Sequence, residues 1–363
     1  MVAPLVEDAP ENVEELGPSN RRNKRGSKAL RLSAISVGLL VACAGVAFAA
    51  YRLVSKEIHR SQDHSEKRLN VHVYAPFGSL AVTPGTYSDI VAKLDMQADE
   101  SGDDPEMYLR YGVTQSGVGN LRVSVGDDEG SLQTSPPLAM WKAASPSLFS
   151  TANFITSDNG AVYRYGFEPR DIAPTPAPQP ANGDYKARLY LTRELPMSLN
   201  AQLGFGESYI DLTGLGLERA YIETGASKVH IVCSAQNKTP MSLYQISAGV
   251  GECTLDGICN TNSSKFEFNG GIGYYTLDFG GQLQHNMEAT VSVGLGKVSL
   301  NIPPQAGRVQ VFYDDNLFSA YNFSGLSIRK SGYATSAGFD QSTAPILTLR
   351  LSSGMGKMVV VYR

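Results

Sequence analysis

Apolar and polar residues alternate with a period of two through much of the C-terminal half of the chain. Each alternating stretch follows two glycines that flank a single, usually apolar, residue. Alternation of this kind predicts β-strands with one buried face and one solvated face. The clearest copies begin at Gly204, Gly249, Gly271, Gly294 and Gly354, and a degenerate copy begins at Gly225.

The start points from Gly204 to Gly294 lie 21 to 24 residues apart, which is the spacing of a structural repeat. Each unit then holds about two short strands, with second strands expected near 220–222 and 288–293. The paired glycines mark corners, because glycine allows positive φ or close backbone approach. Stacked units bury a continuous core. The pattern therefore predicts an all-β protein with a stacked, β-solenoid-like repeat domain.

The alternation also assigns residues to the two faces of each strand. The predicted core face takes two positions per copy: Ser208, Cys253, Tyr275, Val298 and Met358, then Ile210, Leu255, Leu277, Leu300 and Val360. The opposite face is a solvated ladder on which exposed tyrosines could stack on sugar rings. Its candidate binding residues are Glu207, Tyr209, Glu252, Tyr274 and Lys297.

Carboxylates on this ladder are the candidate metal ligands. If the units stack in register, Glu207 and Glu252 fall in one column, and Asp211, Asp256 and Asp278 fall in another. Carboxylates about 4.8 Å apart on adjacent rungs repel, which raises their pKa or recruits a cation such as Ca²⁺. The alternative is that these aspartates close turns by bonding their own backbone, in which case no cofactor is needed.

One segment has the length and composition of a membrane span. Residues 32–51 form a 20-residue apolar run without charge, long enough to cross about 30 Å of hydrocarbon. Basic residues crowd the preceding segment, which favours a cytoplasmic N-terminus and an extracytoplasmic body. Two alternatives stay open: a signal-peptidase site at Ala47-Phe48-Ala49, and a lipid anchor on Cys43. All three place the body outside the cytoplasm.

Changes in composition divide the chain. Prolines at alternate positions from 174 to 180 predict an extended linker, and a fainter copy of the repeat at Gly117 predicts a β domain before it. The predicted order is a disordered cytoplasmic tail (1–31), a transmembrane helix (32–51), a juxtamembrane stalk (52–68), an N-terminal β domain (69–170), a Pro-rich linker (171–184) and the repeat domain (185–363).

Charge and motifs exclude several classes of function. The net charge is −4 and the predicted body has no basic stripe, so nucleic acid is not an expected partner. The histidines lack metal-ligand spacing, and the chain has no nucleophile elbow or P-loop, so we do not expect an enzyme. Cys253 and Cys259 could pair across Gly257 in an oxidising compartment, or stay free and buried together with Cys233.

Residues 196–305 resemble the toast-rack family of bacterial envelope proteins. The segments that carry the resemblance are GFGESYIDLTGL from Gly204, YIETGASKVHI from Tyr221, GVGE from Gly249, LDFGG from Leu277 and GLGKVSLNIPP from Gly294. They are also similar to the C-terminal domains of cell-wall-active antibiotic response proteins and to adhesin-like domains. The resemblance implies a membrane-tethered extracytoplasmic β-stack linked to envelope stress or surface adhesion, and it supplies no catalytic residues.

These observations favour a non-catalytic binding or scaffold module of the cell envelope. Its expected partners are the membrane, an envelope protein or glycan, and a second copy of the chain. Self-association is expected at an open end of the stack, because the last repeat copy ends at Arg363 without a polar cap. One alternative is an envelope-stress sensor that acts through residues 1–31, and another is a polysaccharide-active β-helix enzyme that uses the carboxylates.

Overall fold

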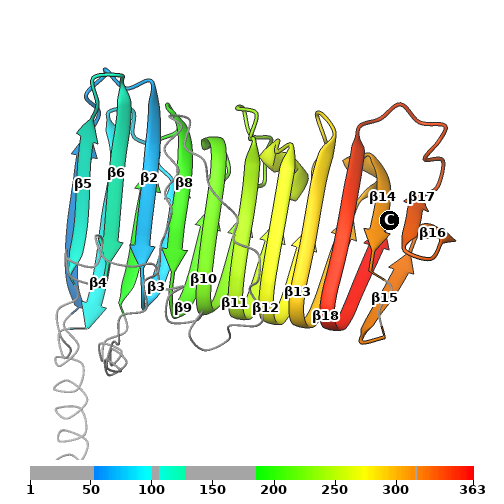
Figure 1. The fold of residues 1–363 in the computed structure, drawn as a ribbon. Helices are drawn as coiled ribbons and strands as arrows, with labels where there is room; N and C mark the ends of the chain where they lie inside the picture. Colours follow the sequence, from blue (N-terminus) through cyan, green and yellow to red (C-terminus); the bar gives the residue numbers. More distant parts are fainter. Residues whose placement is uncertain (1–52, 100–105, 127–184, 315–316) are drawn as a thin grey trace, which may run out of the picture. The chain divides into compact units, whose positions relative to one another are not determined.

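The computed structural model describes residues 53–99, 106–126, 185–314 and 317–363. These residues form 18 β-strands, with short 3-10 turns at Ile258–Thr261 and Pro304–Ala306. No helix among them has the length and apolar character needed to cross a bilayer. The predicted tail, membrane span and Pro-rich linker, with Cys43 and Ala47–Ala49, lie outside the described residues. The all-β prediction is confirmed (Figure 1).

Five long strands form the centre of the stack, and each bends at its glycine pair or, in β10, at Gly225. The first half of β10 pairs with β8 as far as Thr224, whereas its second half pairs with β9 from Ser227 onward. The two strands predicted for each unit are therefore two halves of one bent strand. The long strands are β10 (Gly216–Val232), β11 (Leu243–Asp256), β12 (Lys265–Asp278), β13 (Met287–Ile302) and β18 (Ile346–Tyr362).

The two halves of the bent strands belong to two sheet layers with the core between them. In both layers the long strands pair in parallel and in register. The first layer contains β5 (Met107–Val113), β6 (Val118–Val125), β2 (Arg68–Ala75), β8 (Pro196–Leu203), the first halves, β14 (Arg308–Tyr313), β17 (Tyr333–Ser336) and β16 (Leu326–Lys330). The second contains β1 (Leu53–Ser61), β4 (Ile90–Asp99), β7 (Lys186–Leu191), β3 (Ser79–Pro84), β9 (Gly206–Asp211), the second halves and β15 (Ser319–Ser324).

Strands on both sides of the predicted linker pair with each other. Strand β2 lies between β6 and β8, and β7 lies between β4 and β3. The segment predicted as a stalk instead contains β1, which pairs antiparallel with β4 along its length. Strand β1 contains lysine, glutamate, histidine and arginine, and these residues obscure the apolar–polar alternation that would have predicted a strand. They suit an edge strand, where charged side chains discourage further pairing.

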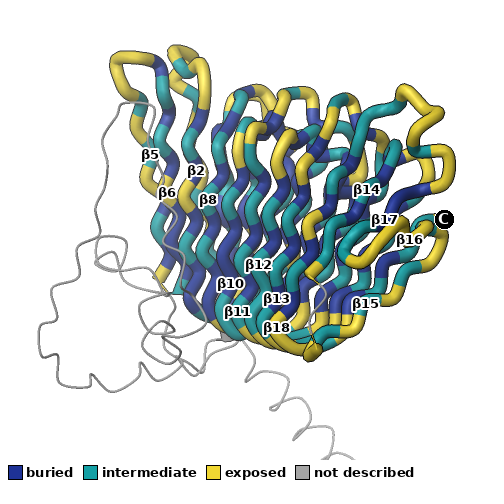
Figure 2. The backbone as a smooth tube through the Cα atoms, turned by 45° about the vertical axis from the view of Figure 1, so that its right-hand side comes forward, coloured by how far each residue is buried: buried dark blue, intermediate teal, exposed yellow. Residues whose placement is uncertain are grey.

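The predicted core face is buried in every copy except the first position of the first copy. Ser208 is half-buried, but the other predicted core positions are at most 2% exposed. In Figure 2 buried stretches of backbone lie at matching heights in neighbouring strands. Cys233, Cys253 and Cys259 are buried free thiols, which decides between the two alternatives left open. Burial raises the pKa of each thiol to about 12.

The last repeat copy does not lie at the end of the stack. Its strand, β18, pairs with β13 on one side and with β14 and β15 on the other. Strands β14 and β15 therefore cover the outer edge of β18, so the reason given for an open end at Arg363 is wrong. Among the described residues, β15 is the outer strand of the second layer at this end, and β16 is the outer strand of the first.

The corner glycines allow the backbones of adjacent rungs to approach closely. Gly296 has a φ of 145°, and a Cβ there would overlap the carbonyl oxygen of Gly273 on the preceding rung. Gly356 also has a φ of 145°, and a Cβ there would overlap the carbonyl oxygen of Gly296. An L-residue at these positions meets both an unfavourable φ and a backbone clash.

We therefore expect Gly296→Ala to destabilise the protein by about 2–4 kcal/mol, because strain and overlap add. Gly112→Ala is the matched control, since a Cβ at Gly112 meets no atom within 4 Å. Chemical denaturation of the full-length variants measures both effects. Equal stability of the two variants would contradict the role assigned to the corner.

Candidate functional site

The outer face of the second layer carries its side chains in rows that cross the strands. The register aligns Lys228 with Glu207 on one side and with Glu252 on the other. Two residues further along each strand, His230 aligns with Tyr209 and Thr254. The in-register stacking expected from the sequence is confirmed. The rows also continue beyond the repeat copies, into strands β3, β7, β4 and β1.

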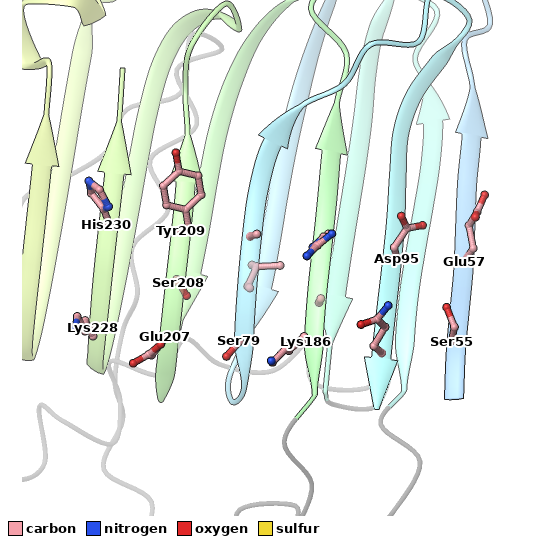
Figure 3. Close-up of a pocket in the computed structure, with 15 residues that line it drawn as sticks. Ser55, Glu57, Ser79, Asp95, Lys186, Glu207, Ser208, Tyr209, Lys228 and His230 are labelled. Carbon is pink, nitrogen blue, oxygen red and sulfur yellow. The ribbon is translucent and has the colours of Figure 1, made fainter. Parts of the chain in front are cut away.

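A polar groove with a volume of about 490 Å³ lies on this face between β1 and β10. Ser79 and Ala81 of β3 form part of its lining, and larger side chains stand on the strands to either side. Figure 3 shows Tyr209, His230 and Lys228 on one side of β3, and Asp95 and Glu57 on the other. The groove exists because β3 presents small side chains where its neighbours present long ones.

Charges of both signs line the groove. Its cationic side chains are Lys186, Arg188 and Lys228, and its carboxylates are Glu57, Asp95 and Glu207. At the β1 side, Lys93 Nζ lies 3.1 Å from Glu57 Oε2 and 3.3 Å from Asp95 Oδ1. A ligand in the groove therefore meets hydrogen-bond donors and acceptors across its whole width.

Three side-chain contacts lie on the other side of the groove. His230 Nε2 lies 2.6 Å from Asp256 Oδ2, and the rings of Tyr209 and His230 form a T-shaped pair with centroids 5.5 Å apart. Lys228 Nζ lies 3.9 Å from Glu252 Oε2. Tyr209 as a whole is 41% exposed, so its side chain is accessible to a ligand.

The predicted binding residues fall into two groups. Glu207 and Tyr209 line the groove, and Glu252 lies one rung beyond it, against Lys228. Tyr274 and Lys297 continue the same row along the stack, outside the groove lining. Glu207 and Glu252 share a row but are not adjacent, because Lys228 of the degenerate repeat copy stands between them.

The three predicted metal ligands also share a row without forming one cluster. Val232 separates Asp211 from Asp256, so only Asp256 and Asp278 are neighbours. Burial, together with the adjacent charge of Asp256, raises the pKa of Asp278. Asp211 Oδ1 accepts a hydrogen bond of 2.9 Å from the backbone N–H of Thr213, which fits the turn role. The part of the chain that the structure describes holds no group of three or more His, Cys, Asp or Glu side chains placed to bind a metal.

Sequence reasoning missed most of the groove. Lys228 and His230 belong to the degenerate copy from Gly225, whose register was visible but was not added to the ladder. Lys186 and Arg188 follow directly after the predicted linker, and Asp95 lies in a strand with no repeat signature. Alternation in β4 and β7 could have identified two half-buried strands, but not their pairing.

Comparisons with known proteins confirm the family resemblance over part of the chain. Residues 177–256 match the family model described as the N-terminal domain of toast_rack, DUF2154. None of the curated proteins matches the sequence. Among solved structures, the chain is similar to a protein provisionally described as a cell adhesion protein from Clostridium sporogenes, with 12% identity, a TM-score of 0.37 and coverage of 85% of this chain and 100% of that one. It is also similar to a provisionally described adhesin from Bacteroides fragilis, with 9% identity, a TM-score of 0.31 and coverage of 85% and 97%.

The Asp256–Asp278 pair predicts a pH effect on stability. Because the pKa of Asp278 is raised in the folded state, its charge destabilises the fold at neutral pH, and this cost disappears once the carboxyl is protonated in both states. Asp278→Asn should therefore raise the melting temperature at neutral pH and leave it unchanged well below the ordinary carboxyl value of 3.8.

Asp211→Asn is the matched control for this measurement, because Asp211 lies in the same row beside Val232. Its melting temperature should change little at either pH. A lower melting temperature for Asp278→Asn at neutral pH would show that the carboxylate stabilises the turn instead.

Proposed function

Because residues 177–256 match the toast-rack family, we propose that this chain is a non-catalytic binding module of the bacterial cell envelope. In this proposal residues 32–51 anchor the chain in the membrane, with residues 53–363 outside the cytoplasm. The ligand is cell-wall glycan, and it binds in the groove between β1 and β10. The observation that carries the proposal is the groove itself, with its small-residue lining and its charges of both signs.

The groove chemistry favours a hydroxyl-rich ligand. Sugar hydroxyls both donate and accept hydrogen bonds, so they can use the ammonium of Lys186 and the carboxylate of Glu207 at once. The partly exposed ring of Tyr209 offers an apolar surface to the C–H face of a sugar. A purely anionic or purely cationic ligand would face like charges on either side.

The direction of the groove suits a polymer. Its lining residues come from successive strands, from β1 across β4, β7, β3 and β9 to β10, so its length runs across the strands. A chain of sugars can follow this direction across the groove. A single rigid hydrogen-bonded sheet supports all these side chains, which limits the entropy lost on binding.

The test is retention of the full-length chain, in mild detergent, on purified peptidoglycan sacculi. Tyr209→Ala should lower the affinity by roughly ten-fold, because losing an aromatic contact costs about 1–2 kcal/mol. Tyr274→Ala is the matched control: Tyr274 is 67% exposed on the same face but lies outside the groove lining.

Equal losses in the two tyrosine variants would place the glycan contact elsewhere on the face. No retention of the wild-type chain on sacculi would contradict the glycan proposal.

A further inference from the structure

A line of exposed apolar side chains runs along the corner where the long strands bend. It consists of the residue between the two corner glycines, or its equivalent, on successive rungs. We call it the corner ridge, and its members are Phe205, Ala226, Val250, Ile272, Leu295 and Met355. All except Ala226 are 36% to 52% exposed. At about 4.8 Å per rung the ridge is about 24 Å long, and Phe77 extends it by stacking on Phe205 with ring centroids 5.8 Å apart.

The fold does not require apolar residues at these positions. Close backbone packing at the corner is made by the flanking glycines, and the side chain between them points away from the core. The rows on either side of the ridge are mainly polar, with Ser247, Asn269 and Ser292 on the first layer and Glu252 and Lys297 on the second. An apolar residue on every rung at an exposed corner therefore indicates a partner that excludes water.

The position of residue 53 indicates what the partner is. In the second layer, Ser55 aligns through Gln97 and Lys186 with Ser79, in the row of Glu207. Leu53 precedes Ser55 by two residues, just as Phe205 of the ridge precedes Glu207 by two residues. The chain therefore enters the sheet at the height of the corner ridge. The 20-residue apolar segment 32–51 ends just before this point. If residues 32–51 span the membrane, as the proposed function holds, the chain leaves the bilayer next to the point where it enters the sheet, at the height of the corner ridge.

The charges beside the ridge are consistent with a lipid surface. The neighbouring row carries Lys186, Lys228, Lys297 and Lys357 against two carboxylates, Glu207 and Glu252. Lys297 and Lys357 lie outside the groove lining. They stand about 7 Å from the ridge, two residues along a strand, so they can reach phosphate groups while the ridge enters the headgroup region. The exposed ring of Tyr274, in the same row, suits the membrane interface as well.

We propose that the corner ridge rests on the outer surface of an anionic bilayer, so that the stack lies edge-on against the membrane that anchors it. This inference rests on the membrane anchoring in the proposed function. A second copy is a weaker candidate for the ridge, because a convex edge one residue wide buries too little area for a stable dimer. Edge-on contact would hold the groove at a fixed height above the membrane.

The test places an environment-sensitive nitrobenzoxadiazole label on the ridge of the full-length chain in phosphatidylglycerol-containing proteoliposomes. Ile272→Cys and Leu295→Cys carry the label in a Cys43→Ser background. The buried thiols, with their raised pKa, should not react. Lys238→Cys is the matched control, since Lys238 is exposed in the loop between β10 and β11, away from the corner.

The proposal predicts blue-shifted emission and quenching by nitroxide-labelled lipid at both ridge positions, and neither effect at position 238. Replacing Lys297 and Lys357 by glutamine should reduce the quenching in anionic vesicles and not in zwitterionic ones. Unquenched ridge labels on a chain that resists carbonate extraction would overturn the ridge proposal and leave the anchor intact.

Other outcomes separate the remaining alternatives. Release of the chain by carbonate would overturn the anchor and the ridge proposal together, whereas glycan retention in the sacculus assay would still stand. A blue shift that grows with protein density, without quenching by lipid, would assign the ridge to a second copy and overturn the membrane contact.

Discussion

The close approach of glycine backbones at the corner is the constraint on which the rest of the structure depends. A Cβ at Gly296 or Gly356 would overlap the carbonyl oxygen of the preceding rung, so β13 and β18 can bend over their neighbours only where no side chain intervenes. In β10 the aligned position is Ser227, and Gly225 is the glycine of the corner. The bend lets one strand contribute to both layers. Parallel in-register pairing then places equivalent residues of each copy side by side, and this produces both the continuous core and the outer rows.

The core of the repeat region could be predicted from the sequence because burial imposes a strict period of two. Leu255, Leu277 and Leu300 occupy the same position in successive copies and are fully buried, as expected. The glycine pairs likewise predicted corners. Where the repeat is degenerate, as at Gly225, the backbone still follows the same path, because the strand needs only a glycine at the corner and alternate apolar residues behind it.

The candidate site was harder to predict because its residues come from strands that pair across large sequence separations. Alternation says which side of a strand faces outward, but not which strand lies next to it. Nothing in the sequence of β1 indicates that it pairs with β4, and its charged residues obscure the alternation by which a strand is predicted. In the same way, β18 is inserted between β13 and β15 by a fold-back that no local pattern encodes. Pairing order is set by the whole core, not by any one segment.

The different roles of the core, the corner and the outer rows follow from these constraints. Inward positions are occupied by the core, and Gly296 and Gly356 at the bends leave no room for a side chain. The outer rows and the middle corner residue are therefore the positions that the fold constrains least. The groove and the corner ridge are built from those positions. Small side chains at Ser79 and Ala81 interrupt the outer rows and open the groove, whereas apolar side chains such as Ile272 and Leu295 line the corner. Both features lie on the second layer or at its margin, so one rigid sheet links the groove to the corner ridge.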